Sequence, residues 1–233
     1  MTSAGVVARV AGLLGDESRA AMCLAMLDGG RWTVSELAAE AHVSAATASE
    51  HVARLAAGGL VATETEGRNK YVRLNDTRVG ELVETLASFG EQPAPTSLNA
   101  ARSRRRLATA RTCYDHLAGR LGVAVHDAMV EQRLLSERGG VAVTARGRDW
   151  FADLGADLGA YAGNRAFVRD CLDLTERRPH LAGHVGAVLC STFLNQGWVR
   201  RPDRSRALVV TPSGERRLHD LLRITPADLA LAG

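Results

Sequence analysis

A chain of 233 residues, 46% of them hydrophobic and 24% charged, is long enough to form one large domain or two smaller ones with ordinary apolar cores. There is no charged N-terminal region followed by an apolar run, and no apolar stretch long enough to span a bilayer, which favours a cytoplasmic protein without a membrane partner. The four cysteines form no C-x-x-C pair and do not predict a disulfide framework.

Charge is distributed unevenly along the chain. Residues 1–95 carry 8 basic and 12 acidic side chains, whereas residues 96–233 carry 21 basic and 14 acidic ones. A nucleic-acid surface in the first part must therefore be a local basic patch, because the net charge of that whole region is negative.

Two helices are predicted at the start of the chain. Apolar residues recur at helical spacing in residues 3–14, and Asp16 is the expected N-cap of a second helix that runs to Leu27. Cys23 falls on the inward face of this second helix, where we expect it to be a small buried hydrophobe.

A helix-turn-helix is predicted from Thr33 onwards. Thr33 and Glu36 have capping-box spacing, residues 41–44 form the turn, and Ser44 is the expected N-cap of a second helix that stops at Gly58. The start of this second helix carries small and polar residues, which fit the major groove of DNA without steric conflict. The residues expected to face the groove are Ser44, Ala45, Thr47, Ser49, His51 and Arg54.

A β-hairpin wing is predicted directly after this helix, from short β-runs at residues 60–64 and 70–74. Arg68, Lys70 and Arg73 lie near its tip and are expected to reach the DNA backbone. A second interpretation stays open, in which the winged helix is a protein-interaction scaffold without specific DNA binding.

Another amphipathic helix is predicted over residues 76–89, and it flanks the winged helix as residues 3–14 do on the other side. Two such helices are what the interface of a homodimer needs. The proline-containing stretch that follows predicts a domain boundary. We therefore expect a DNA-binding and dimerisation domain at 1–92, a linker at 93–100 and a C-terminal domain at 101–233.

Five short motifs follow one another in the first part of the chain. They read Leu13-Leu14-Gly15-Asp16-x-Ser18-Arg19, Thr33-x-x-Glu36-Leu37-Ala38, Val43-Ser44-x-Ala46-Thr47-x-Ser49-x-His51-x-x-x-Leu55, Gly58-Gly59-Leu60-Val61 and Gly67-Arg68-x-x-Tyr71. In combination they resemble the ArsR-type family of winged-helix transcriptional repressors over residues 9–90. The resemblance implies a homodimer that binds double-stranded DNA at an inverted-repeat operator and leaves it when an inducer binds.

The chain departs from the metal-sensing members of that family. The helix at residues 36–41 has no cysteine, and the helix at residues 76–89 has no histidine, so neither of the family's familiar metal sites is carried over. The long C-terminal extension resembles only a larger-subunit branch of the family.

The C-terminal part contains an internal repeat. The residues His116-Leu117-Ala118-Gly119 recur as His180-Leu181-Ala182-Gly183. Around them, residues 112–160 and 165–225 each predict a long helix, a short β-hairpin and a closing helix, which is a winged-helix-like outline. The predicted fold class is therefore mainly α with small β-hairpins (α+β): an N-terminal winged helix-turn-helix and a C-terminal domain of two repeated units, related by a hypothetical pseudo-twofold axis with a cleft between them.

Three interpretations of the repeated part stay open, and no cofactor is assigned. In the first, its cysteines and histidines only pack. In the second, a metal ion or an oxidant acts on Cys113, His116, Cys171 and His180; Cys113 and His116 are expected to share a helix face, at a spacing that zinc accepts. In the third, a small organic effector enters the cleft between the repeats. The residues expected to line that cleft are Leu117, Leu121, Met129, Leu181, Phe193 and Trp198.

Enzymatic function is not predicted. The sequence has no G-x-S-x-G, no P-loop, no H-E-x-x-H and no cluster of paired carboxylates. The function we expect is a DNA-binding transcriptional regulator, most simply a repressor whose effector acts on the C-terminal part.

Overall fold

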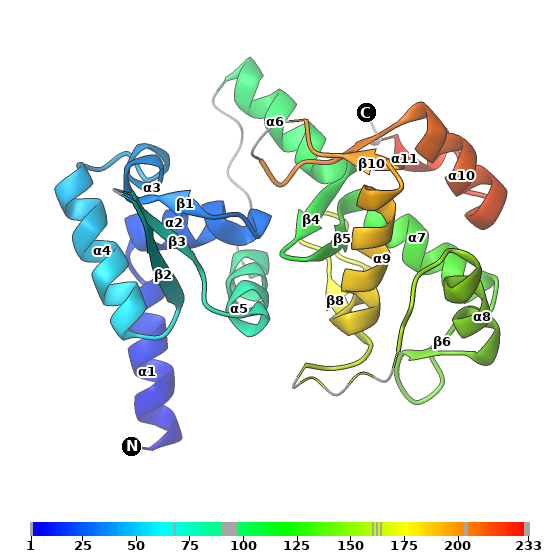
Figure 1. Ribbon diagram of the computed structural model, residues 1–233, viewed down its shortest axis with the longest axis horizontal. Helices are drawn as coiled ribbons and strands as arrows, with labels where there is room; N and C mark the ends of the chain where they lie inside the picture. Colours follow the sequence, from blue (N-terminus) through cyan, green and yellow to red (C-terminus); the bar gives the residue numbers. More distant parts are fainter. Residues whose placement is uncertain are drawn as a thin grey trace. The chain divides into compact units, whose positions relative to one another are not determined.

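The structure is a computed structural model that describes residues 2–67, 69–89, 97–159, 161, 163, 165–202 and 205–230. The chain divides into two compact units, Met1–Ala87 and Ser88–Gly233, which are described separately (Figure 1). The helix that opens the second unit begins at Leu98, inside the stretch predicted as linker, and residues 93–96 of that predicted linker lie outside the described residues. Within the described residues, no helix is long and apolar enough to cross a membrane.

The N-terminal unit is a winged helix-turn-helix. Its elements are α1 (Ser3–Leu14), α2 (Glu17–Ala25), a 3-10 turn η1 (Met26–Asp28), β1 (Trp32–Thr33), α3 (Val34–Glu40), α4 (Ala45–Ala57), β2 (Val61–Glu66), β3 (Asn69–Leu74) and α5 (Thr77–Ser88). The sheet order is β1-β3-β2 with antiparallel pairing, and β1 was not predicted. Strands β2 and β3 form the wing.

Local capping residues fix where these helices begin. The Thr33 hydroxyl accepts from the Glu36 amide, and the Glu36 carboxylate accepts in return from the Thr33 amide, so the predicted capping box is confirmed. The predicted caps Asp16 and Ser44 are confirmed as well. These contacts satisfy amides that the first helical turn leaves without a partner. They set the turn between α3 and α4, and thereby the direction of α4.

The core of the N-terminal unit is apolar. Cys23 is fully buried in it, as predicted. Burial raises the pKa of the Cys23 thiol to about 12, which leaves it an inert thiol. The other fully buried side chains include Met22, Met26, Leu27, Leu37, Val52, Leu55 and Val72.

The C-terminal unit opens with α6 (Leu98–Thr109) and continues with two series of elements in the same order. The first is β4 (Arg111–Cys113), β5 (His116–Ala118), α7 (Gly119–Glu131), β6 (Leu135–Ser136), β7 (Ala142–Val143) and α8 (Ala145–Asp153). The second is β8 (Arg169–Leu172), β9 (Pro179–Ala182), α9 (Gly183–Asn195), β10 (Val199–Arg200), β11 (Val209–Val210) and α10 (Pro212–Leu222), followed by the short α11 (Pro226–Leu229).

The two series interlock. Helix α7 packs against β9 of the second series, and α9 packs against β5 of the first (Figure 1). The helix–hairpin–helix order was predicted, but the hairpins β4–β5 and β8–β9 that precede the long helices were not. The duplication itself, and its pseudo-twofold axis, stay predictions.

Close packing explains two of the repeated glycines. A Cβ on Gly122 would lie 2.5 Å from the carbonyl oxygen of Leu117, and one on Gly186 would lie 2.4 Å from that of Leu181. Each would also meet the histidine of the other series, because it would stand 3.5 Å from His180 Cβ or 3.2 Å from His116 Cβ. Glycine therefore allows each helix to approach the opposite hairpin.

The six residues predicted to line an effector cleft do not border an open space. They are all buried in the main hydrophobic core of the C-terminal unit, with exposed fractions of 0–4%. The space between the two series is filled by these side chains, since interiors pack at crystal-like density. The residues concerned are Leu117, Leu121, Met129, Leu181, Phe193 and Trp198.

Candidate DNA interface and buried Cys–His cluster

The N-terminal half of α4 presents small polar groups to the surface. The Ser44 hydroxyl accepts from the Thr47 amide at 3.1 Å, and the two hydroxyls lie 2.8 Å apart. Five of the six residues predicted to face the groove are exposed, whereas Ala48, Val52 and Leu55 on the opposite face are buried. The exposed residues are Ser44, Ala45, Thr47, Ser49 and Arg54.

His51, the sixth of these residues, lies differently from the prediction. Its side chain is only 12% exposed. Its Nδ1 is 3.5 Å from Arg19 Nη1, and its Nε2 is 3.8 Å from Asp16 Oδ1. Arg19 is itself buried and donates to the carbonyl oxygens of Gly12 and Leu13. The contacts of His51 are thus with the N-cap and first turn of α2, and they hold α4 against α2 rather than leave the ring free for a base edge.

Two of the three wing cations predicted from the sequence lie within the described residues. Lys70 is exposed on β3, but Arg73 is half-buried and lies 3.5 Å from Glu64. Arg68 lies outside the described residues. Arg31, which sequence reasoning missed, bonds to Glu66 at 2.8 Å and stacks over the Tyr71 ring at 4.3 Å.

This arrangement follows from the strand register of the wing. Glu64 pairs with Tyr71 and Glu66 with Asn69 across the two strands, so both carboxylates lie close to the arginines. The sequence alone could not place Arg31 beside the turn of the wing, because that position depends on the pairing of β1 with β3.

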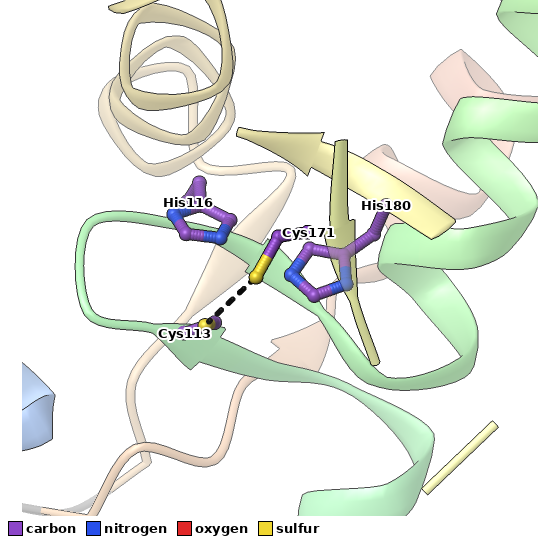
Figure 2. A group of neighbouring side chains, drawn as sticks. All are labelled: Cys113, His116, Cys171 and His180. Carbon is purple, nitrogen blue, oxygen red and sulfur yellow. Dashed lines mark hydrogen bonds between the residues drawn. The ribbon is translucent and has the colours of Figure 1, made fainter. Parts of the chain in front are cut away.

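The cluster of Cys113, His116, Cys171 and His180 is assembled from two hairpins. Cys113 is opposite His116 in β4–β5, and Cys171 is opposite His180 in β8–β9. Directly opposed residues of an antiparallel pair point to the same face, which places each cysteine beside its histidine. The prediction that Cys113 and His116 share a helix face is therefore wrong, but the prediction that the four side chains come together matches their positions (Figure 2).

The four side chains are close enough to act together. One ligand atom from each lies within 4.8 Å of all the others, and the two sulfurs are 4.0 Å apart. The two imidazole rings are stacked with centroids 5.0 Å apart. Exposed fractions run from 0% for His180 to 9% for Cys171, so the cluster is closed to solvent.

A carboxylate stands behind each histidine, and an arginine from the other series holds each carboxylate. His116 Nδ1 lies 3.2 Å from Asp115 Oδ1, and Arg165 donates to Asp115 Oδ2 at 2.6 Å. His180 Nδ1 lies 3.7 Å from Asp173 Oδ2, and Arg111 donates to that oxygen at 3.0 Å.

Asp173 is the most completely bonded of these groups. Beyond Arg111 it accepts from the backbone amides of Gly119, Thr175 and Glu176. Burial alone would raise its pKa, but Arg111 and the amide donors hold the pKa of Asp173 well below its usual range. The Arg111–Asp173 pair is thus a fully buried ion pair that joins the two series.

The cluster changes the acidity of its own members. The largest influence on the pKa of Cys171 is the hydrogen bond with Cys113, which lowers it. Burial raises this pKa, but the nearby His116 and His180 rings lower it further, and the result is a pKa of about 2. Burial would lower the pKa of His116, but Asp115 and Cys171 raise it above its usual value. The pKa of His180 is lowered instead, because of burial and the neighbouring His116. Cys171 therefore favours the thiolate form, which is both the nucleophile and the metal ligand.

The fourth cysteine shows what burial does without such neighbours. Cys190 lies in the apolar core of the same unit, and burial raises its pKa to about 12. A buried thiol in this unit is thus not acidic by default. The acidity of Cys171 is a property of the cluster.

A cavity elsewhere in the C-terminal unit offers another location for an organic effector. A cavity of about 570 Å³ lies between α6, β11 and α11, with apolar walls that include Leu208, Val210 and Leu229. Arg102, Arg105 and Arg106 of α6 line its rim. The third interpretation from the sequence therefore has a different candidate location from the one predicted.

The capped helix-turn-helix, the exposed start of α4 and the wing define a class of protein, the winged helix-turn-helix DNA-binding proteins. The Helix-turn-helix domain family model HTH_20 matches residues 14–64. The chain is 36% identical over 211 residues to the HTH-type transcriptional regulator YdfF of Bacillus subtilis (strain 168), and the match covers 90% of this chain and 93% of YdfF.

Solved winged-helix regulators are also similar to this chain. HlyU from Vibrio cholerae N16961 is 27% identical, and the match covers 40% of this chain and all of HlyU with a TM-score of 0.35. The homodimeric winged helix-turn-helix domain of Mb0332 from Mycobacterium bovis, described as a possible ArsR-family regulator, is 30% identical over 35% of this chain and 75% of that one, with a TM-score of 0.32.

The match to YdfF runs along nearly the whole of both chains. The protein therefore belongs to the family of helix-turn-helix transcriptional regulators that includes YdfF.

Proposed function

We propose that this transcriptional regulator is a homodimeric repressor that binds an inverted-repeat operator and is released when an effector acts on its C-terminal unit. The observation that carries DNA recognition is the exposed start of α4, where the hydroxyls of Ser44 and Thr47 lie 2.8 Å apart at the surface. Hydroxyls of this kind bond to base edges and phosphates in the major groove.

Two flanking helices support the homodimer. Helix α1 has no buried residue, and Val6 and Val7 on it are 40% and 67% exposed. Leu86 on α5 is 47% exposed. Large apolar side chains exposed on flanking helices fit an interface with a second copy, which would place two α4 helices about 34 Å apart, one turn of DNA.

The effector part of the proposal is supported by the contrast among the cysteines. Cys113 and Cys171 lie with two histidines in a closed polar cluster, whereas Cys23 and Cys190 are isolated in apolar cores. Thiols in the first environment are the reactive or ligand-binding kind.

A gel-shift titration of the purified full chain on the DNA upstream of its own gene tests the proposal. We expect a salt-sensitive shift that a scrambled duplex does not give, and its loss on adding Zn²⁺ or a mild oxidant. A chain that shifts both duplexes equally is the protein-interaction scaffold of the second interpretation.

The homodimer is tested by light scattering of the same sample. Val7→Glu and Leu86→Glu are expected to shift the mass to that of one chain. Leu24→Glu is the matched control, since Leu24 is 37% exposed on α2, outside the predicted interface. A wild-type chain that is monomeric at micromolar concentration contradicts the proposed assembly.

A further inference from the structure

The Cys113, His116, Cys171 and His180 cluster has the composition and geometry of a metal site. We propose that these four side chains bind one Zn²⁺-class divalent cation in a tetrahedral site that ties the two series of the C-terminal unit together. This proposal deepens the proposed function, because it names the ion for the same cluster; its tests read zinc binding directly, so they can fail independently of DNA release.

The distances are those of a nearly formed tetrahedron. With Zn–S bonds of about 2.3 Å and Zn–N bonds of about 2.0 Å, neighbouring ligand atoms in a tetrahedral site lie roughly 3.3–3.8 Å apart. The two sulfurs are 4.0 Å apart here, and every pair of ligand atoms lies within 4.8 Å. Contraction by about 1 Å, within reach of side-chain torsions, brings all four atoms to one ion.

The histidine nitrogens give an independent sign of a ligand. His116 Nε2 and both ring nitrogens of His180 are buried, and no hydrogen bond of ordinary geometry reaches them within the described residues. Buried polar atoms in native proteins are nearly always bonded, so such a group requires an explanation. A cation between the two rings and the two sulfurs supplies one for Nε2 of each ring.

The carboxylates beside the two histidine rings also indicate a metal site. Metal-bound histidines usually give their second nitrogen to a carboxylate, which fixes the tautomer and the direction of the ring. Asp115 stands at Nδ1 of His116, which directs Nε2 of that ring toward the sulfurs. Asp173 stands more loosely at Nδ1 of His180, which directs Nε2 of the second ring in the same way.

The choice of ion follows from the ligand set and its closure. Two thiolates and two imidazoles in tetrahedral arrangement suit zinc, while carboxylate-preferring ions such as Mg²⁺ and Ca²⁺ are disfavoured. Four protein ligands and the 0–9% exposure leave no open position for water or substrate, which is typical of a structural rather than a catalytic zinc site. The ion would hold β4–β5 to β8–β9.

Elemental analysis of the full chain, with Zn²⁺ as the probe, tests the site. The chain is reduced, freed of metal with a chelator, and dialysed against Zn²⁺. We expect about one zinc per chain, with release of a proton on binding because the Cys113 thiol must ionise. Replacement by Co²⁺ should give the intense visible absorption of tetrahedral cobalt thiolate.

Matched variants assign the ligands. We expect Cys113→Ala and Cys171→Ala each to lose the zinc, whereas Cys190→Ala and Cys23→Ala retain it. Asp115→Asn, which keeps all four ligands, is expected to weaken zinc binding about 10–100-fold. Asp127→Asn is its control, since Asp127 pairs with the exposed Arg178 and not with a histidine of the cluster.

Two measurements on the wild-type chain keep the test valid if a ligand variant fails to fold. Zn²⁺ should raise the thermal midpoint of the metal-free protein and should protect Cys113 and Cys171 from alkylation, as read by mass spectrometry. A folded, reduced wild-type chain that binds no zinc, or one whose Cys113 and Cys171 alkylate equally fast with and without Zn²⁺, overturns the proposal. So does a Cys113→Ala, Cys171→Ala chain that binds zinc like the wild type.

Discussion

The two units place their polar side chains in opposite ways. In the N-terminal unit the hydroxyls of Ser44 and Thr47 and the amine of Lys70 lie at the surface, over an apolar core. In the C-terminal unit Arg111, Asp173 and the two histidines of the cluster are almost completely buried. A surface site of the first kind can be changed with little effect on folding, whereas a buried site of the second kind is part of what holds the unit together.

The most destabilising change we expect is Asp173→Asn. It leaves the guanidinium of Arg111 buried without its counter-charge, and breaking a buried pair in this way costs about 3–5 kcal/mol. The free energy of unfolding can be followed through Trp150 and Trp198 in a Trp32→Phe background, which reports the C-terminal unit. The control Asp127→Asn removes an exposed pair and should cost about 0–1 kcal/mol. Equal losses in the two variants would show that burial of the Arg111–Asp173 pair does not determine the cost.

The same carboxylate should make the C-terminal unit sensitive to acid. The folded-state pKa of Asp173 lies below its unfolded value, so its contribution is fully present above about pH 4 and is lost as the pH falls further. Urea midpoints of the metal-free chain, measured from pH 5 downwards, should decrease steeply for the wild type and less steeply for Asp173→Asn. Parallel curves for the two chains would show that another group is responsible.

In the N-terminal unit the expected effect is on binding and not on folding. Thr47→Ala removes an exposed hydroxyl at the start of α4 and should weaken operator binding by about 1–3 kcal/mol. The free energy of unfolding should stay within about 0.5 kcal/mol of the wild type. Fluorescence anisotropy on operator and scrambled duplexes measures the first quantity, and chemical unfolding the second. Unchanged operator affinity would remove Thr47 from the interface.

The smallest expected effect is that of Lys70→Ala on the wing. An exposed lysine that contacts a phosphate releases about one counterion, so its loss should reduce the salt slope of DNA binding by roughly 1 and weaken operator and scrambled DNA alike. Binding measured across a range of salt concentrations gives the slope. A loss confined to the operator would mean that Lys70 reads bases.

The surface site was readable from the sequence because its signals are local. Thr33 and Glu36, or Ser44 and Thr47, are three residues apart, and the cap, the turn and the helix they specify lie within one short segment. Side-chain partners across the fold were not readable. His51 was expected in the groove because nothing local shows that Arg19 reaches it from α2.

The buried cluster shows a different limit. A spacing of three fits one turn of helix and also a tight β-hairpin, so the spacing alone does not distinguish them; in the structure Tyr114, with a φ of 58°, lies in the hairpin turn. The arginine–carboxylate pairs cross between the two series, so spacing along the chain does not reveal them. One signal was present: arginine, cysteine and aspartate alternate in both Arg111-Thr112-Cys113-Tyr114-Asp115 and Arg169-Asp170-Cys171-Leu172-Asp173.

The interlocking of the two series has a consequence for biosynthesis. The ribosome releases β4–β5 well before β8–β9, and at about 5–20 residues per second the segment from Cys113 to His180 takes roughly 3–13 s to emerge. During that interval the first hairpin has no partner from its own chain. The C-terminal unit can therefore reach its interlocked form only after the second series has been synthesised.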